Sequence, residues 1–423
     1  MRLPLAMSPR RIRQLWYVPV LATAMGLVML RLLVLAHLLD VHAFAVFSGG
    51  LLVSSTFCMV SCLGLQSLLQ RAWPVHLVRG QELRAMVTAA QCNLLALASA
   101  LVLCLCAAAG VSLPGVEPRL LAAGVVHGAA QQVFLVATTE SRSRGEALGY
   151  AWQQLTRAGL VFTLGAAAAA STASPMVVIC AETLISASLA LTIVHRSLAR
   201  AALGWGSVLQ LAVHRIPRVP WRSALTMMAV MLVGFVALNA DRWVASHLLV
   251  QEGFAQYSFV AILLGVAQGA QSLINASVYP LLARRFASSG HAVTFRICLR
   301  ASCWLLAVGV LVSVPMAGVL QYSVARWYPQ YSEAIGLIPL LLAVAVLRIS
   351  DFSSSYLLIT GYERRLLVLN GATVVCGTLI WLAWATPWKG TPTTLWDISL
   401  LAALLSLLGS LGTAGAAWAV RRA

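Results

Sequence analysis

The segment His37-Leu38-Leu39 followed by Phe44-Ala45-Val46-Phe47-Ser48 recurs half a chain length later as His247-Leu248-Leu249 followed by Phe254-Ala255-Gln256-Tyr257-Ser258. An arginine lies just upstream of each copy inside an apolar run, Arg31 before the first and Arg242 before the second. Each following apolar run closes with two leucines and an arginine, at 68–71 and at 281–284. This equivalent placement predicts one helical module written twice, as residues 1–215 and 216–423.

The composition is that of a membrane protein. Of 423 residues, 60% are hydrophobic and 10% are charged, and the mean hydropathy is +0.87, whereas about 25% of a soluble domain is charged. A bilayer span needs about 20 apolar residues. Twelve runs meet that need, near 14–38, 44–69, 85–109, 118–139, 148–171, 174–195, 223–249, 254–283, 296–320, 333–360, 366–386 and 396–420. We therefore expect an all-α polytopic fold.

The net charge of +17 reflects topology rather than nucleic-acid binding, because the arginines gather in alternate connections. Examples are the N-terminal Arg10 and Arg11, the pair Arg142 and Arg144, and the C-terminal Arg421. Cytoplasmic loops of membrane proteins carry such an excess, which predicts that both termini are cytoplasmic. Basic loops are also attracted to anionic lipid headgroups, so membrane lipids are expected partners and nucleic acid is not.

An even number of spans in each half predicts parallel repeats, related by an axis along the membrane normal. The two six-helix bundles would then be related by pseudo-two-fold symmetry around a central cavity, and a substrate site is expected where they meet. Outward loops are short, which leaves no room for a periplasmic catalytic domain. No catalytic residue and no cofactor is predicted. The nine cysteines lie in or beside apolar runs, so neither disulfides nor a metal site is expected.

Four arginines lie several residues inside apolar runs, namely Arg31, Arg157, Arg242 and Arg348. An arginine at mid-bilayer costs about 2.5–3.5 kcal/mol on the insertion scale, so it persists where it meets water, a partner or a ligand. Snorkelling to the interface is the alternative, and it suits Arg31 and Arg157 best because each lies near a helix end. Our interpretation is that the four arginines bind substrate.

Three acids are candidates for ion coupling: Glu182, Asp241 and Asp351. Asp351 follows Arg348 by three residues, so a structural ion pair along one helix is the alternative there. Asp241 and Arg242 are adjacent and point about 100° apart on a helix. Asp241 is therefore free to meet another helix or a proton.

Polar stripes on apolar helices predict a wet interior. Gln268, Gln271 and Asn275 share one helix face and are candidate substrate-binding residues. His127 shares a face with Gln131, and Gln153 shares one with Arg157. Interhelical hydrogen bonds could explain any one stripe. With four arginines, a water-filled cavity of net positive charge accounts for them better, and such a cavity selects anions such as phosphates.

A resemblance is carried by Asp241-Arg242-Trp243-Val244-Ala245, Gly253, Tyr257-Ser258 and Tyr279-Pro280-Leu281-Leu282-Ala283-Arg284. These stretches resemble the seventh and eighth spans of Wzx-type polysaccharide flippases, in the multidrug/oligosaccharidyl-lipid/polysaccharide exporter superfamily. Arg31 leading into His37, and Gly64-Leu65 before Arg71, are similar to the start of such proteins. One departure is Val41-His42-Ala43, where relatives commonly carry a glycine.

The resemblance implies flipping of an undecaprenyl-diphosphate-linked oligosaccharide across the bacterial inner membrane, from the cytoplasmic to the periplasmic leaflet. The resemblance also implies alternating access, coupling to H⁺ or Na⁺, a role in making O-antigen, capsule or exopolysaccharide, and association with a polysaccharide assembly machinery. Two alternatives stay open. One is a multidrug or metabolite antiporter of the same fold, and the other is a polysaccharide polymerase or ligase.

Overall fold

The computed structural model describes residues 16–111, 116–384 and 392–421, with only part of the side chains of 272–289. The described chain is helical almost throughout, and the predicted all-α fold is confirmed. Contacts divide it into two compact units, Met1–Met231 and Leu232–Ala423, each described by itself. The arginines before residue 16, Lys389 and Arg422 lie outside the described residues.

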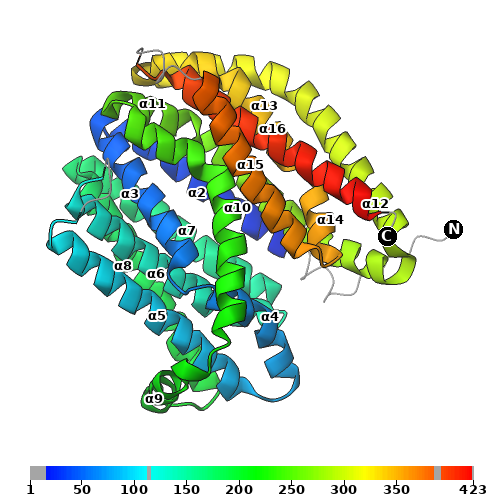
Figure 1. The fold of residues 1–423 in the computed structure, drawn as a ribbon. Helices are drawn as coiled ribbons and strands as arrows, with labels where there is room; N and C mark the ends of the chain where they lie inside the picture. The colour runs from blue at the N-terminus through cyan, green and yellow to red at the C-terminus, as the bar shows by residue number, and fades with distance from the viewer. Residues whose placement is uncertain (1–15, 112–115, 385–391, 422–423) are drawn as a thin grey trace. The chain divides into compact units, whose positions relative to one another are not determined.

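The helices of the first unit run from blue to green in Figure 1. They are α2 (Tyr17–Leu38), α3 (Val41–Val60), α4 (Leu65–Val78), α5 (Glu82–Ala108), α6 (Pro118–Ser143), α7 (Ala147–Thr172), α8 (Pro175–Arg200), α9 (Trp205–Arg215) and the short η1 (Ile216–Arg218). The division between the units falls inside α10 (Trp221–Leu248), whereas the predicted boundary of the bundles precedes that helix.

The second unit contains the rest of α10 and the helices drawn from green to red in Figure 1. They are α11 (Gln251–Val260), α12 (Ile262–Trp327), η2 (Pro329–Leu337), α13 (Ile338–Ser350), α14 (Ser353–Ile359), α15 (Glu363–Trp384) and α16 (Leu395–Val420). Gly290 interrupts α12 with a positive φ of 70°, so the element is two helices joined at a break.

Eleven helical segments of the described chain are long and apolar enough to cross a membrane, and the chain is a multi-pass membrane protein. Twelve were predicted. The remaining run forms α7, which has the length but not the hydropathy, because Gln153, Gln154 and Arg157 interrupt its apolar residues.

Local breaks correct several predicted spans. The run 44–69 is two helices, because Leu63 and Gly64 both adopt positive φ between α3 and α4. The run 333–360 is also broken, at Asp351, between α13 and α14. The stretch after α8, which lies between the predicted spans 174–195 and 223–249, contains the amphipathic α9, whose Val208 and Ala212 are buried. Each unexpected feature is shorter than the window over which hydropathy is averaged.

Within the first unit, α3 and α6 approach closely through glycines one turn apart. A Cβ added at Gly124 would lie 2.9 Å from the Gly50 carbonyl oxygen, and one added at Gly128 would lie 2.7 Å from the Ser54 carbonyl oxygen. Small residues at this spacing let membrane helices pack backbone to backbone. The contact brings His127, next to Gly128, against Ser54.

Gly128→Ala is therefore expected to push α3 away from α6 and to lower the free energy of unfolding by about 1–3 kcal/mol, the usual cost of overpacking. A thermal melt of the purified protein in detergent measures the change. Gly159→Ala is the matched control, since a Cβ there meets no atom within 4 Å. Equal melting temperatures for the two variants would contradict the close packing.

Candidate functional site

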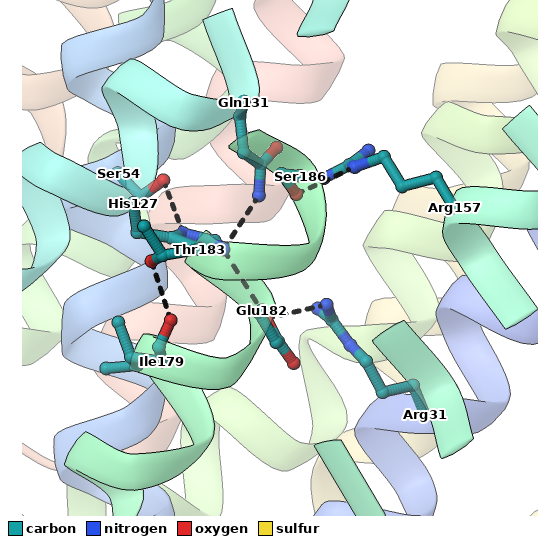
Figure 2. Close-up of polar contacts among 9 residues, drawn as sticks. All are labelled: Arg31, Ser54, His127, Gln131, Arg157, Ile179, Glu182, Thr183 and Ser186. Atoms are coloured by element: carbon teal, nitrogen blue, oxygen red, sulfur yellow. Dashed lines mark hydrogen bonds and ion pairs between the residues drawn. The ribbon is translucent and has the colours of Figure 1, made fainter. Parts of the chain in front are cut away.

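The first unit contains a cluster of buried and half-buried charged and polar side chains, shown in Figure 2, which we call the first acid–arginine cluster. Arg31 comes from α2, His127 and Gln131 from α6, Arg157 from α7, and Glu182 and Ser186 from α8. In this unit α7 packs on α2 and α8, and α6 packs on α8, so four helices deliver the cluster to one place.

Arg31 and Glu182 form its central ion pair. Arg31 Nη1 donates to Glu182 Oε2 at 2.9 Å, and both side chains are buried. The same carboxylate oxygen lies 3.4 Å from His127 Nε2. Arg31 therefore does not snorkel to an interface. A candidate substrate residue and a candidate coupling residue are paired with each other.

His127 is held at both ring nitrogens. Its Nδ1 lies 2.9 Å from Ser54 Oγ, and its Nε2 lies 3.2 Å from Gln131 Nε2, which confirms that His127 and Gln131 share one face. The cluster is not saturated, because Glu182 Oε1 and Arg31 Nε are buried with no hydrogen-bond partner among the described residues. Buried polar atoms in that state favour binding a proton, water or ligand.

Arg157 supplies the positive charge that the cluster does not neutralise. Its Nε donates to Ser186 Oγ at 3.1 Å, and its guanidinium lies 5.0 Å from the centre of the Phe134 ring. No acidic side chain of the described chain pairs with it. Gln153, on the same face, donates to Ser141 Oγ instead.

Regular helix spacing produces this arrangement. His127 and Gln131 lie four residues apart on α6, and Glu182 and Ser186 lie four apart on α8, so each pair faces one neighbour. Sequence reasoning placed His127 and Gln131 on one face but gave His127 no role. The only feature of the sequence that pointed to His127 is its position inside an apolar run. That position does not show which acid the histidine contacts.

The second unit contains a comparable group, which we call the second acid–arginine cluster: the buried Asp241, Tyr257 and Arg348 and the half-buried Arg242. Tyr257 Oη donates to Asp241 Oδ2 at 2.5 Å, and both residues are fully buried. Arg242 Nη2 donates to the Ala261 carbonyl at 2.8 Å. As predicted, Asp241 meets another helix, and its neighbour Arg242 takes a different partner.

Arg348 is buried and held by neutral groups. Its Nε donates to Ser406 Oγ at 3.0 Å and its Nη1 donates to the Leu238 carbonyl at 3.2 Å. Its Nη2 has no hydrogen-bond partner among the described residues, and neither does Asp241 Oδ1. Tyr257 belongs to the duplicated segment, yet it had no predicted role, because Phe47 stands at the matching position of the first copy.

The possible ion pair between Arg348 and Asp351 is wrong, because α13 ends at Ser350 and Asp351 leaves helical geometry. Asp351 instead caps α14. Its Oδ1 accepts from the Ser353 and Ser354 amides at 3.1 and 3.2 Å, and from Thr413 Oγ1 at 3.2 Å. Helix amides prefer an oxygen acceptor at this position.

Asp351→Ala is expected to lower the free energy of unfolding by about 1–2 kcal/mol through loss of the cap. Asp351→Asn keeps an amide oxygen in the same place and should retain most of the stability and all of the transport. Melting temperatures and a transport assay of the two variants test this. Loss of transport in Asp351→Asn at normal stability would return Asp351 to an ion-coupling role.

The predicted polar stripe on α12 is described in part. Gln271 Nε2 lies 3.5 Å from the Asp351 carbonyl, at the limit of a hydrogen bond. Gln268 Nε2 is buried with no partner among the described residues. The side chain of Asn275 lies outside the described part of the structure. Whether these three residues bind substrate stays a prediction.

The two units share one chemistry. Each places two arginines near one acid. In the first, Arg31 pairs with Glu182 and Arg157 lies close by. In the second, Arg242 and Arg348 lie near the Asp241–Tyr257 pair and donate to neutral groups. Each acid touches a group that can carry a proton, His127 or Tyr257. Each cluster therefore holds an excess of positive charge beside a carboxylate.

The comparisons with known proteins bear on the fold. No family model matches the chain, and no curated protein matches its sequence. Solved structures match over nearly the whole chain. The MATE transporter VcmN of Vibrio cholerae, crystallised as a point mutant, is 13% identical with a TM-score of 0.59, and 97% of each chain is covered.

Two further structures match. The lipid II flippase MurJ in an inward closed conformation is 10% identical with a TM-score of 0.58, covering 95% of this chain and 87% of that one. An inward-facing multidrug resistance MATE family transporter of the MOP superfamily is 13% identical with a TM-score of 0.54, covering 95% of each chain. The chain therefore has the helical fold shared by MATE transporters and the lipid flippase MurJ.

Proposed function

We propose that the protein is a flippase that moves a lipid-diphosphate-linked oligosaccharide, carried on undecaprenyl diphosphate, from the cytoplasmic to the periplasmic leaflet of a bacterial inner membrane by alternating access. The observation that carries the proposal is Arg157, an arginine without an acidic partner among the described residues, beside the buried pair of Arg31 and Glu182. An excess guanidinium in a buried site favours anions, and phosphate oxygens match its geometry.

The acids account for coupling to a proton. Glu182 in its charged form neutralises Arg31. Protonation of Glu182 leaves Arg31 without a counter-charge, so a diphosphate then binds there more tightly. His127, in contact with the same carboxylate oxygen, is a group through which the proton can arrive. Asp241 with Tyr257 is the corresponding coupling group of the second unit, while Asp351 serves as a helix cap.

A multidrug antiporter is the second candidate, because solved MATE transporters match the fold as well as MurJ does. The positive charge of the two clusters distinguishes the antiporter from the flippase. A cationic drug in either cluster would meet two arginines for each acid, and that repulsion disfavours it. A lipid diphosphate would be attracted to the arginines of both clusters.

Binding to the purified protein tests the proposal. We expect undecaprenyl diphosphate to bind more tightly than the cationic dye ethidium, and Arg157→Gln to weaken its binding by about 10- to 100-fold, the value of a hydrogen bond to a charged group. Arg200→Gln is the matched control, since that arginine is half exposed and pairs with Glu146. Tighter binding of ethidium would favour the antiporter.

A further inference from the structure

The first unit contains an apolar cavity outside the cluster, which we call the lateral groove. It has a volume of about 680 Å³ and lies between α5, α6 and α8. Its lining is almost wholly aliphatic and aromatic, with Asn93, Thr183 and Ser197 as the polar exceptions. The Ser197 hydroxyl donates to Glu140, so it is already satisfied.

Small side chains make the room. Alanines occupy positions on all three walls, including Ala90 on α5, Ala130 on α6 and Ala187 on α8. A larger residue at any of them would fill the space. Ala187 is exposed and Ala90 is half buried, so the groove is reached from outside the unit.

The groove and the first acid–arginine cluster lie on different faces of the same helices. On α8, Glu182 and Ser186 face the cluster while Thr183 and Ala187 line the groove. On α6, His127 faces the cluster while the neighbouring Val126 lines the groove. A molecule in the groove therefore does not touch Arg31 or Glu182, and it is not the headgroup that the cluster would bind.

The walls identify the occupant as hydrocarbon. The three helices α5, α6 and α8 are all candidate membrane spans. A groove in such helices opens to the bilayer core, where acyl chains are the medium. The lining residues of α5 run from Met86 to Ala100, about 20 Å along the helix axis, so an extended chain rather than a compact ligand fits its length.

One end of the groove has residues that are typical of the membrane–water interface. Trp205 and Leu209 of α9 close that end, and Trp205 Nε1 lies 3.4 Å from His195 Nδ1. Tryptophan gathers where the membrane meets water. His195 and Arg196 are exposed beside Ser197 at the same end, and the positive charge of Arg196 complements an anionic headgroup.

We propose that the lateral groove binds one hydrocarbon chain of an anionic membrane phospholipid, whose headgroup lies beside His195 and Arg196. The lipid is a resident of the first unit and not the transported substrate, because the groove is turned away from the arginine cluster. This assignment holds for a flippase and for an antiporter alike.

Native mass spectrometry of the full-length protein, delipidated in detergent, tests the site. We expect phosphatidylglycerol to bind more tightly than phosphatidylcholine of the same chains. Ala187→Phe should weaken phosphatidylglycerol binding by about tenfold, because the ring takes the place of part of the chain and removes its close contacts with the groove wall. Ala90→Phe fills the groove from the opposite wall and should give the same loss.

Control variants distinguish binding of the hydrocarbon chain from recognition of the headgroup. Ala167→Phe, an exposed alanine of α7 away from the groove, should bind phosphatidylglycerol like the original protein. Arg196→Gln should remove the preference for phosphatidylglycerol over phosphatidylcholine and leave the binding of phosphatidylcholine unchanged. Melting temperatures establish that each variant is folded.

Two results would overturn the proposal. One is undiminished phosphatidylglycerol binding in folded Ala187→Phe or Ala90→Phe. The other is displacement of bound phosphatidylglycerol from the original protein by undecaprenyl phosphate at equal concentration, which would assign the groove to a polyprenyl chain.

Discussion

Replacement of Glu182 by glutamine is expected to stop transport and to lower stability together. The buried Arg31 would lose its counter-charge, and breaking a buried pair from one side costs about 3–5 kcal/mol. Glutamine also cannot take up and release a proton. The double variant Arg31→Gln/Glu182→Gln removes both charges, so most of the stability should return while transport stays absent.

Surface polysaccharide in cells and the melting temperature of the purified protein measure the two effects separately. Glu252→Gln, which changes an exposed acid of α11, is the control and should alter neither. Transport by the double variant at the original rate would show that the pair is structural only, and it would remove Glu182 from the coupling mechanism.

Gly64→Ala is expected to prevent the protein from accumulating in the membrane. Gly64 has φ of 79° at the turn between α3 and α4, where a side chain is strained. A Cβ there would also lie 1.9 Å from the Ala224 carbonyl oxygen and 2.7 Å from the Met228 amide nitrogen, both backbone atoms of α10. Neither can rotate away, so α4 and the start of α10 would have to separate.

The variant Gly80→Ala is the control that distinguishes backbone strain from a steric clash of the added Cβ. Gly80 has φ of 65°, yet a Cβ there meets no atom within 4 Å. It should cost only the conformational strain, about 1–2 kcal/mol. Protein yield in the membrane fraction and the melting temperature of both variants give the comparison. If Gly64→Ala were as abundant and stable as Gly80→Ala, the close approach of α10 would be wrong.

The sequence predicts the fold class because membrane spans depend on long averages of hydropathy. It does not predict the turn at Leu63 and Gly64 or the break at Asp351, because each depends on the backbone of a few residues. It also misses α9, whose amphipathic eleven residues average out within a longer window.

The sequence selects candidate site residues by their type and not by the partners that they contact. Arg31 and Glu182 stood out because a charge inside an apolar run is costly. Their pairing could not be predicted, since they are 151 residues apart and nothing in one sequence says that α2 and α8 deliver them to one place. The possible ion pair of Arg348 with Asp351 is wrong because their helical spacing presumes a continuous helix, and α13 ends at Ser350.

The duplicated segment likewise identifies candidate residues but does not predict their contacts. It places Arg31 near the end of α2 and Arg242 near the end of α10, although the offset of 210 residues between His37 and His247 aligns Arg31 with Asp241. Their partners differ, since Arg31 pairs with a carboxylate and Arg242 with a backbone carbonyl. Both clusters contain two arginines for one acid. The helices that supply them differ, because Arg157 and Glu182 come from α7 and α8, whereas Arg348 and Asp241 come from α13 and α10. What the copies share is therefore their charge balance rather than their contacts.

Transport by the purified protein in liposomes tests the central claim most directly. The substrate is an undecaprenyl-diphosphate-linked oligosaccharide placed in one leaflet, and its appearance in the other is followed with and without an imposed pH gradient. Because protonation of Glu182 tightens diphosphate binding, we expect a gradient acidic on the side of the donor leaflet to accelerate flipping by the original protein and to have no effect on Arg31→Gln/Glu182→Gln. Gradient-driven transport of ethidium, with no flipping of the lipid, would contradict the account.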